Sequence, residues 1–305
     1  MPAGSEPPGR SGRSPQEQAA GYHQVGVEQA GVEQAVGGDL LRSLEAGVLW
    51  VTLNRPDMGN AMTADMNAQL ATWVEEASAD LSVRCLVIAG AGEKGFCTGA
   101  DLRASRAPSP RPSGAPTPAM GEVARVIRIG WQRLIGSLID CEKPVIAAVN
   151  GTAAGGGMHL ALACDLVVAA EGSRFIEAFV RRGIAPDAGG AYLLTRLVGL
   201  QKAKELLFFG EAISATEAER IGLVNRVVPR DELAQVVKQM AASLAQGPTK
   251  AIGAAKWLAN RALETDRSTS FWEEAMVQEM VQQSEDAHEG VKSFVERREP
   301  RYVGW

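Results

Sequence analysis

Two glycine-bearing segments follow apolar runs in this sequence, and together they could bind one oxygen atom. The first, 90–102, comes after the apolar run 85–89, and the second, 151–157, comes after the apolar run 145–149. A glycine-rich turn after a strand lets the backbone approach a ligand closely, and the N-terminus of a following helix points free N–H groups at negative charge. Two such turns side by side could donate two hydrogen bonds to a single oxygen, which is an oxyanion hole.

The composition is that of an ordinary globular protein, and it narrows the range of partners. The chain has 305 residues, of which 46% are hydrophobic and 22% charged, and its formal net charge is -5. These proportions suit a chain with a substantial core, and the charge gives no electrostatic attraction to nucleic acid or to an anionic membrane. No apolar stretch approaches the ~18 residues of a membrane span. We therefore expect neither nucleic acid nor membrane as a partner.

The cysteines show no spacing typical of a metal site or of a disulfide framework. None of the four forms a CxxC pair, and three fall in or beside expected strands. We expect them to be reduced core residues in a reducing compartment, with no metal site. They are Cys85, Cys97, Cys141 and Cys164.

The elements that must position the two glycine segments alternate along the first half of the chain. Strands are expected at 47–53, 85–89, 145–149 and 166–169, with a helix capped by Thr63 and another over 120–140 between them. This order predicts an α/β fold with a mostly parallel sheet. From residue 188 onward the pattern is mainly helical. Helices are expected there at 192–200, 202–209, 215–221, 231–246, 249–263, 272–283 and 291–298.

Taken together, these segments resemble the crotonase family, the enoyl-CoA hydratase/isomerase superfamily. The likeness follows the family order from about residue 41 to residue 298. Its motifs are at 53–56, 60–61, 96–102, 149–157, 163–166, 183–190 and 218–228. The resemblance implies a crotonase (ClpP-like) fold, a spiral of β-β-α units over 39–230, with a helical C-terminal region at 231–305 through which members form trimers, often paired into hexamers.

The resemblance also implies what the two turns bind. The backbone N–H groups of Ala100 and Gly156 would hold the thioester carbonyl of an acyl-CoA, so that the charge of an enolate is stabilised where it develops. Other substrate-binding positions carried over from the family are Arg55, Asp101, Leu102, Arg103, Gly155 and Phe179. Arg55 and Arg103 are either partners of the CoA phosphates or solvated charges, and Arg297 or Arg298 could add a contact. No cofactor is expected, because the CoA is part of the substrate.

The departures from the family pattern decide which reaction is expected. Hydratases of this family hold one water between two glutamates, and those positions are His159 and Phe179 here. Asp187 occupies the position of the catalytic aspartate in the family's dienoyl-CoA and epoxyphenylacetyl-CoA isomerases. One carboxylate can move a proton from one carbon to another, and Phe179 would keep the site dry. We therefore predict a cytoplasmic enoyl-CoA isomerase that uses Asp187 as its single acid/base.

Several alternatives remain open at this stage. Asp187 could instead cap a helix that starts near residue 188. His159, one helical turn after Gly156, could be an acid/base partner or a neutral lining residue, and Glu177 could be a second carboxylate or a surface group. A hydratase that pairs Asp187 with His159 or Glu177 is the rival reaction. A non-catalytic homologue that binds CoA or a protein partner is the rival from another class.

Two segments of low complexity complete the expected organisation. Residues 1–38 are rich in proline, glycine and serine and contain the repeated pentapeptide of 26–30 and 31–35. We expect them to be a disordered leader, or else an organelle-targeting peptide. The proline-rich stretch 104–118 follows the first glycine segment, and it is either a flexible flap over the substrate entrance or a tolerated surface insertion.

Overall fold

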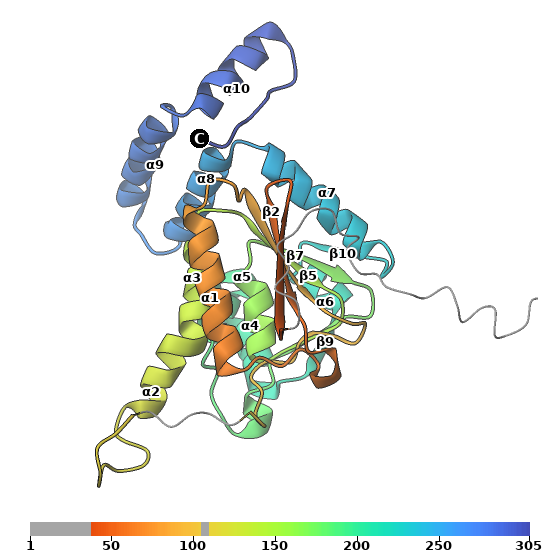
Figure 1. The fold of residues 1–305 in the computed structure, drawn as a ribbon, viewed down its shortest axis with the longest axis vertical. Helices are drawn as coiled ribbons and strands as arrows, with labels where there is room; N and C mark the ends of the chain where they lie inside the picture. The colour runs from red at the N-terminus through yellow and green to blue at the C-terminus, as the bar shows by residue number, and fades with distance from the viewer. Residues whose placement is uncertain (1–37, 105–109) are drawn as a thin grey trace, which may run out of the picture. The chain divides into compact units, whose positions relative to one another are not determined.

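The computed structural model describes residues 38–104 and 110–305, all of which belong to one compact unit (Figure 1). The predicted leader lies outside the described residues except for Gly38, and so does the 105–109 part of the proline-rich stretch. Its remainder, 110–118, contains turns but neither helix nor strand. The role of this stretch as a flap and the domain boundary at residue 230 stay predictions.

The main sheet has six strands in the order β1-β2-β3-β5-β7-β10. Their bounds are Leu40–Glu45, Val48–Leu53, Cys85–Gly90, Val145–Val149, Leu166–Ala170 and Arg226–Val228. β1 and β2 pair antiparallel, and every other neighbouring pair is parallel. The predicted mostly parallel sheet is confirmed, and β1 and β10 are strands that the sequence patterns did not indicate.

The glycine-bearing segments contribute two strands to a second, smaller sheet. Its strands are β4 (Gly95–Cys97), β6 (Thr152–Ala154), β8 (Arg174–Ile176) and β9 (Ala212–Ser214), in the order β4-β6-β8-β9. The chain passes from β3 to β4, from β5 to β6 and from β7 to β8, and a helical segment follows each of these pairs. This repetition of β-β-α units brings the two glycine segments to neighbouring strands, because β4 and β6 pair in parallel.

Helices surround the sheets (Figure 1). Their bounds are α1 Ala64–Ala79, α2 Glu122–Ile127, α3 Arg133–Asp140, α4 Gly156–Leu162, α5 Gly190–Phe209, α6 Ala215–Arg220, α7 Leu233–Gln246, α8 Thr249–Ala262, α9 Arg267–Val281 and α10 Glu285–Glu296. The predicted Thr63 cap of α1 is confirmed, since its hydroxyl accepts a hydrogen bond from the Met66 amide. The helix expected at 120–140 contains a π-helical turn at 128–132, where Gly130 leaves helical geometry. The two helices expected at 192–209 are one element, α5, broken at Gly199.

The main sheet is covered on both faces. Successive β3 side chains point to opposite faces, and they pack in two different apolar clusters. Leu86 and Ile88 belong to the larger apolar cluster, to which α1, α3, α4 and α5 contribute. Val87 packs in a second cluster with Leu233 and Val237 of α7, which lies on the other side of the strands (Figure 1). Fully burying each such side chain contributes about 1.5–3 kcal/mol. The four cysteines are buried and free, as predicted.

The C-terminal segment is tied to the sheet by hydrogen bonds from Arg84, which directly precedes β3. Its guanidinium donates to the Gly247 carbonyl at 2.6 Å, to the Thr249 hydroxyl at 2.9 Å and to the Tyr302 carbonyl at 3.2 Å. These bonds join the beginning of α8 and the last residues of the chain to one strand. In the part of the chain that the structure describes, no helix is long and apolar enough to cross a bilayer.

Candidate active site

The two glycine segments are in direct backbone contact. A Cβ at Gly99 would lie 3.2 Å from the Gly156 nitrogen and 3.0 Å from the Ala154 oxygen. A Cβ at Gly157 would lie 2.1 Å from the Cys97 carbonyl oxygen, which is closer than real Cβ contacts come. Any side chain at these positions would therefore push the turns apart, and glycine is what allows them to meet.

The amides of Ala100 and Gly156, one in each turn, have no hydrogen-bond acceptor among the described residues. In the first turn, Met62 and Ala100 form a parallel β-bridge. The Met62 amide donates to the Gly99 carbonyl and the Asp101 amide donates to the Met62 carbonyl, so this bridge does not use the N–H of Ala100. Gly156 is the first residue of α4, and its N–H has no partner within 38–104 or 110–305 either. Each turn therefore presents an unpaired donor, and that the two together form an oxyanion hole stays a prediction.

Two aromatic rings pack against the second turn. A Cβ at Gly156 would lie 2.8 Å from the Trp131 indole, and one at Gly155 would lie 3.7 Å from the Phe179 ring. Both aromatic side chains are buried, each with 8% of its surface exposed. The Gly156 donor therefore lies beside buried aromatic rings, and a less polar environment strengthens electrostatic interactions made there.

The helical segment that carries Trp131 also contacts the Asp187 segment. The Gln132 side-chain amide donates to the Asp187 carbonyl at 3.3 Å, and a Cβ at Gly189 would lie 3.2 Å from Ile135. Asp187 is half-buried. The alternative that Asp187 caps the following helix is wrong, because α5 begins at Gly190 and its N-cap is Gly189 with φ 78°. The left-handed backbone of this cap residue favours glycine. Asp187 lies two residues before the cap.

His159 and Glu177 form a buried pair next to this segment. The His159 Nε2 lies 2.8 Å from the Glu177 Oε2, and the two side chains are 0% and 1% exposed. The imidazole stacks on Phe179 with ring centroids 5.1 Å apart, and a Cβ at Gly190 would lie 2.1 Å from its Nε2. The alternative that Glu177 is a surface group is therefore wrong. The sequence patterns suggested each residue singly but did not reveal their contact.

The substrate-binding residues expected in the first turn have different surroundings. The Arg55 guanidinium lies 2.9 Å from Asp101 and donates to the Ala61 carbonyl at 2.6 Å. The pKa of Asp101 is lowered, chiefly because its carboxylate accepts a hydrogen bond from the Arg103 amide, and secondarily because of Arg55. Leu102 is 75% exposed. Arg55 thus fixes the turn through Asp101, and the roles of Leu102 and Arg103 toward CoA stay predictions.

Neither Arg298 nor either of two surface hollows contacts the glycine turns within the described residues. Arg298 forms ion pairs with Glu289 and Glu296. Among the hollows on the surface of the described residues, one lies beside α5 and β9 and another is lined by residues of α3, α8 and α9; neither of these is lined by a residue of the glycine turns. We locate the site by the backbone contacts of the turns, because they hold the unpaired donors. No cluster of His, Cys, Asp or Glu within 38–104 and 110–305 could hold a metal ion.

Trp131 and Gln132 are candidate site residues that the sequence patterns did not indicate. They lie in the π-helical turn Arg128–Gln132, within a segment predicted to be an ordinary helix. The detectable signal was Gly130, since a glycine inside a helical pattern weakens the helix and sometimes marks a functional irregularity.

Comparison with known proteins gives one consistent result. A family model described as enoyl-CoA hydratase/isomerase matches residues 43–304. The 1,2-epoxyphenylacetyl-CoA isomerase of Escherichia coli is 38% identical over 87% of this chain and 98% of its own length. The short-chain-enoyl-CoA hydratase of Clostridium acetobutylicum is 35% identical over 83% of this chain and 93% of its own length.

The solved structures agree with these sequence matches. The crystal structure of an enoyl-CoA hydratase from Bacillus anthracis superimposes with a TM-score of 0.79 and 31% identity, over 88% of this chain and 100% of the other. The α/β architecture described above is therefore the crotonase fold. From its site, its fold and its relatives, this chain belongs to the enoyl-CoA hydratase/isomerase family of enzymes.

Proposed function

We propose that this enzyme shifts a double bond in an enoyl-CoA thioester through an enolate. The observation that carries the proposal is the pair of unpaired N–H groups of Ala100 and Gly156, presented by turns in backbone contact. The thioester oxygen would accept both hydrogen bonds, which become stronger as it takes up the negative charge of the enolate. Losing one such donor typically costs on the order of 3–4 kcal/mol of transition-state stabilisation.

Asp187 is the proposed single acid/base. It would remove a proton from one carbon of the acyl group, and the electron pair would move into the thioester to form the enolate. The same proton would then return to a different carbon. Support comes from the Gln132 hydrogen bond, which holds the Asp187 backbone beside the segment that carries Trp131. The relative from Escherichia coli bears the name of an isomerase that acts on a CoA thioester. No cofactor takes part beyond the CoA of the substrate, and we place the reaction in the cytoplasm.

Hydration is the second candidate, and the His159–Glu177 contact is the observation that favours it. A carboxylate 2.8 Å from an imidazole could share protons with a bound water. Both side chains are buried, however, and Phe179 stacks on the imidazole, so water would reach the pair only after a rearrangement. Asp187 is less buried than this pair, which is why we favour isomerisation.

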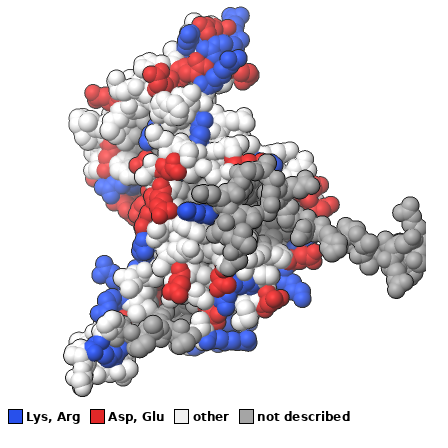
Figure 2. Space-filling model, in the orientation of Figure 1, with Lys and Arg blue, Asp and Glu red and all other residues white. Residues whose placement is uncertain are grey.

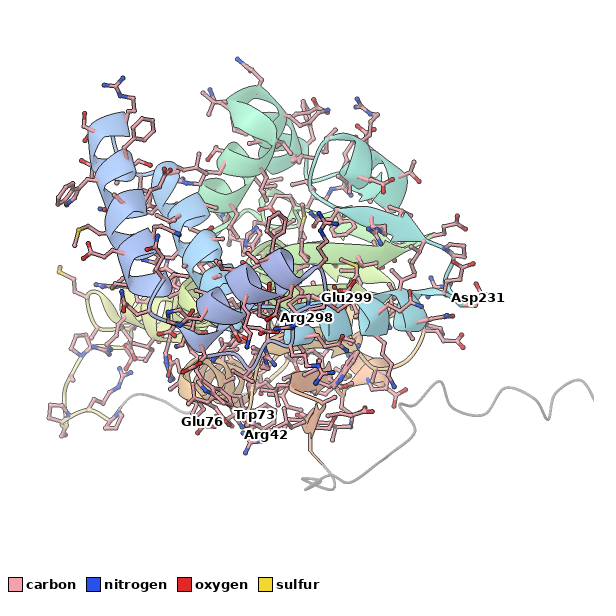
Figure 3. The ribbon with its side chains drawn as sticks, turned by 90° about the horizontal axis from the view of Figure 1, so that it is seen from above. Arg42, Trp73, Glu76, Asp231, Arg298 and Glu299 are labelled. Atoms are coloured by element: carbon pink, nitrogen blue, oxygen red, sulfur yellow. The ribbon has the colours of Figure 1, made fainter. Side chains whose placement is uncertain are left out.

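Asp187→Asn tests the assignment. With a trans-3-enoyl-CoA as substrate, formation of the conjugated 2-enoyl thioester is followed by its absorbance. We expect kcat to fall 10²- to 10⁴-fold, because general acid–base catalysis contributes about that much. The control is Asp231→Asn, since Asp231 is an exposed aspartate that lies just before α7 (Figure 3). Full activity in Asp187→Asn would show that the base is another group.

The hydratase candidate is separated by a second measurement on the same proteins. A trans-2-enoyl-CoA loses its conjugated absorbance when water adds across the double bond. Rapid loss with the unaltered enzyme, abolished in His159→Gln or Glu177→Gln, would overturn the isomerase proposal in favour of hydration. A chain that binds acyl-CoA but converts neither substrate would be the non-catalytic homologue.

We further propose that the enzyme assembles as a homotrimer, and that two trimers can pair to form a hexamer. The support is a set of large apolar side chains exposed on α9 and α10, where a soluble monomer would expose few. These are Phe271, Trp272, Met276, Met280, Val291, Phe294 and Val295. Charges of both signs are interspersed over the face shown in Figure 2, so it presents no large patch of one charge.

A further inference from the structure

Two aromatic rings lie against the turn that carries the proposed Gly156 donor. The Trp131 indole covers the Cα of Gly156, because three of its ring carbons lie 2.8–3.0 Å from where a Cβ would be. The Phe179 ring stands against Gly155 in the same way, at 3.7 Å. The indole therefore lies against the residue whose N–H is proposed to hold the thioester carbonyl.

Trp131 is fixed in this position by the segment that carries it. It lies in the π-helical turn 128–132, whose Gly130 has φ -96° and ψ -106°. The residue after it, Gln132, donates a hydrogen bond to the Asp187 carbonyl at 3.3 Å, and Ile135 packs on Gly189. The indole is thus anchored between the oxyanion turn and the Asp187 segment, and with 8% exposure it has little freedom to move aside.

We propose that Trp131 is a specificity-determining residue that selects flat, conjugated acyl groups over flexible saturated chains. The proposal rests on the enolate function argued above. A planar dienoyl or ring-bearing acyl group can stack on an aromatic ring and gains the energy of offset stacking. A saturated chain must lose rotamer freedom to fit the same contact, and that loss weakens its binding. The Phe179 ring adds a second apolar contact, so polar acyl groups are disfavoured at this place.

The test compares two thioesters that have the same number of acyl carbons. Binding of 2,4-hexadienoyl-CoA and of hexanoyl-CoA is measured by calorimetry in the Asp187→Asn background, where turnover is suppressed. We expect the dienoyl thioester to bind at least about tenfold tighter. Trp131→Leu keeps an apolar side chain but removes the ring, and it should bring the two affinities to within about threefold. Trp131→Phe keeps a ring and should retain most of the preference.

Trp73→Leu is the matched control. Trp73 has the same 8% exposure, but it lies on α1 beneath Arg42, whose guanidinium is 4.9 Å from the ring, close to Glu76 (Figure 3). Its replacement removes an equally buried indole away from the turns, so the ratio of the two affinities should not change. If Trp73→Leu changes the ratio as much as Trp131→Leu does, the effect is a general loss of stability and the proposal is wrong.

The outcomes separate this inference from the proposed function. A ratio unchanged by Trp131→Leu, with turnover still lost in Asp187→Asn, overturns the specificity role and leaves the enolate mechanism intact. A ratio that collapses in Trp131→Leu, with turnover retained in Asp187→Asn, supports the specificity role and overturns Asp187 as the base. If neither thioester binds, both proposals fall.

Discussion

At the residue scale, the contact between the two turns depends on a missing side chain at position 157. We predict that Gly157→Ala destabilises the protein by about 3 kcal/mol or more, because the new methyl group would lie 2.1 Å from the Cys97 carbonyl oxygen. Inserting a methyl into a packed site commonly costs 1–3 kcal/mol, and here the obstacle is backbone that cannot rotate away. Urea unfolding followed by circular dichroism measures the change.

Gly136→Ala is the control for that prediction, and its sign should be opposite. Gly136 lies inside α3, and no atom comes within 4 Å of the position that its Cβ would take. Alanine is favoured over glycine in a helix interior by about 0.5–1 kcal/mol, so this variant should be more stable than the parent chain. Equal effects of the two substitutions would show that the backbone contact at 157 is not what matters.

The buried His159–Glu177 pair is the residue-scale feature with the least evident role. The Nδ1 of His159 and the Oε1 of Glu177 have no hydrogen-bond partner within the described ranges. An unsatisfied buried polar atom costs about 1–3 kcal/mol, so the pair is retained at some expense of stability. Its contact with Phe179 and the need for glycine at 190 show that it shapes the wall beside the Asp187 segment.

At the element scale, charge interactions at the end of α10 make the C-terminal region sensitive to acid. Glu289 has its pKa lowered to about 2, chiefly by hydrogen bonds from Arg298 and then by the Arg301 amide. A carboxylate whose pKa is lower in the folded state stabilises that state above its unfolded value, and the stabilisation is lost as the pH falls toward the folded value. The relevant window runs from about 4.5 down to about 2.

We therefore predict that Glu289→Gln lowers the Tm at neutral pH and that the difference from the parent chain shrinks as the pH falls through this window. Calorimetric scans at several pH values would measure it. Glu285→Gln is a suitable control, because Glu285 is an exposed residue in the first turn of the same helix. A difference that stays constant down to pH 2 would contradict the role given to the Arg298 pair.

The elements that the sequence patterns predicted well are those decided by local spacing. α1 follows from the Thr63 cap and from apolar residues at helical spacing, and the central strands β3, β5 and β7 follow from continuous apolar runs. The short strands β4, β6, β8 and β9 were missed, because each has only three residues and is defined by partners far along the chain. α10 was expected to begin at 291 but begins at Glu285, since the Ser284 hydroxyl caps it.

In the candidate site too, features set by local sequence could be predicted, and features set by distant contacts could not. The sequence predicted that two glycine-bearing turns could lie side by side, because glycine content and the order of strand and turn are visible in it. Trp131 was not predicted, since its place depends on a π-helical turn and on a contact with a residue 25 positions further along the chain. The resemblance to the family supplied the roles of Asp187 and the two amides, which no periodicity could have given.

At the scale of the whole molecule, the exposed apolar residues of α9 and α10 predict association of identical chains. Sedimentation equilibrium should give a mass about three or six times the 32.3 kDa of one chain. We expect Trp272→Glu to reduce this mass, because Trp272 is 68% exposed on α9 and a charge there would be buried in the contact. Met120→Glu is the control, since Met120 is also exposed but lies before α2. A parent chain that sediments as a single copy would disprove the assembly.

The π-helical turn at 128–132 has a consequence for how such enzymes diverge. A π turn accommodates one residue more than an α-helical turn does, and each residue added to or removed from a helix rotates the following side chains by about 100°. Deleting a single codon within this turn is therefore expected to move the indole relative to Gly156 without changing the sequence of either glycine segment. If Trp131 has the proposed role, gain or loss of one codon here is a short genetic route to a new acyl preference.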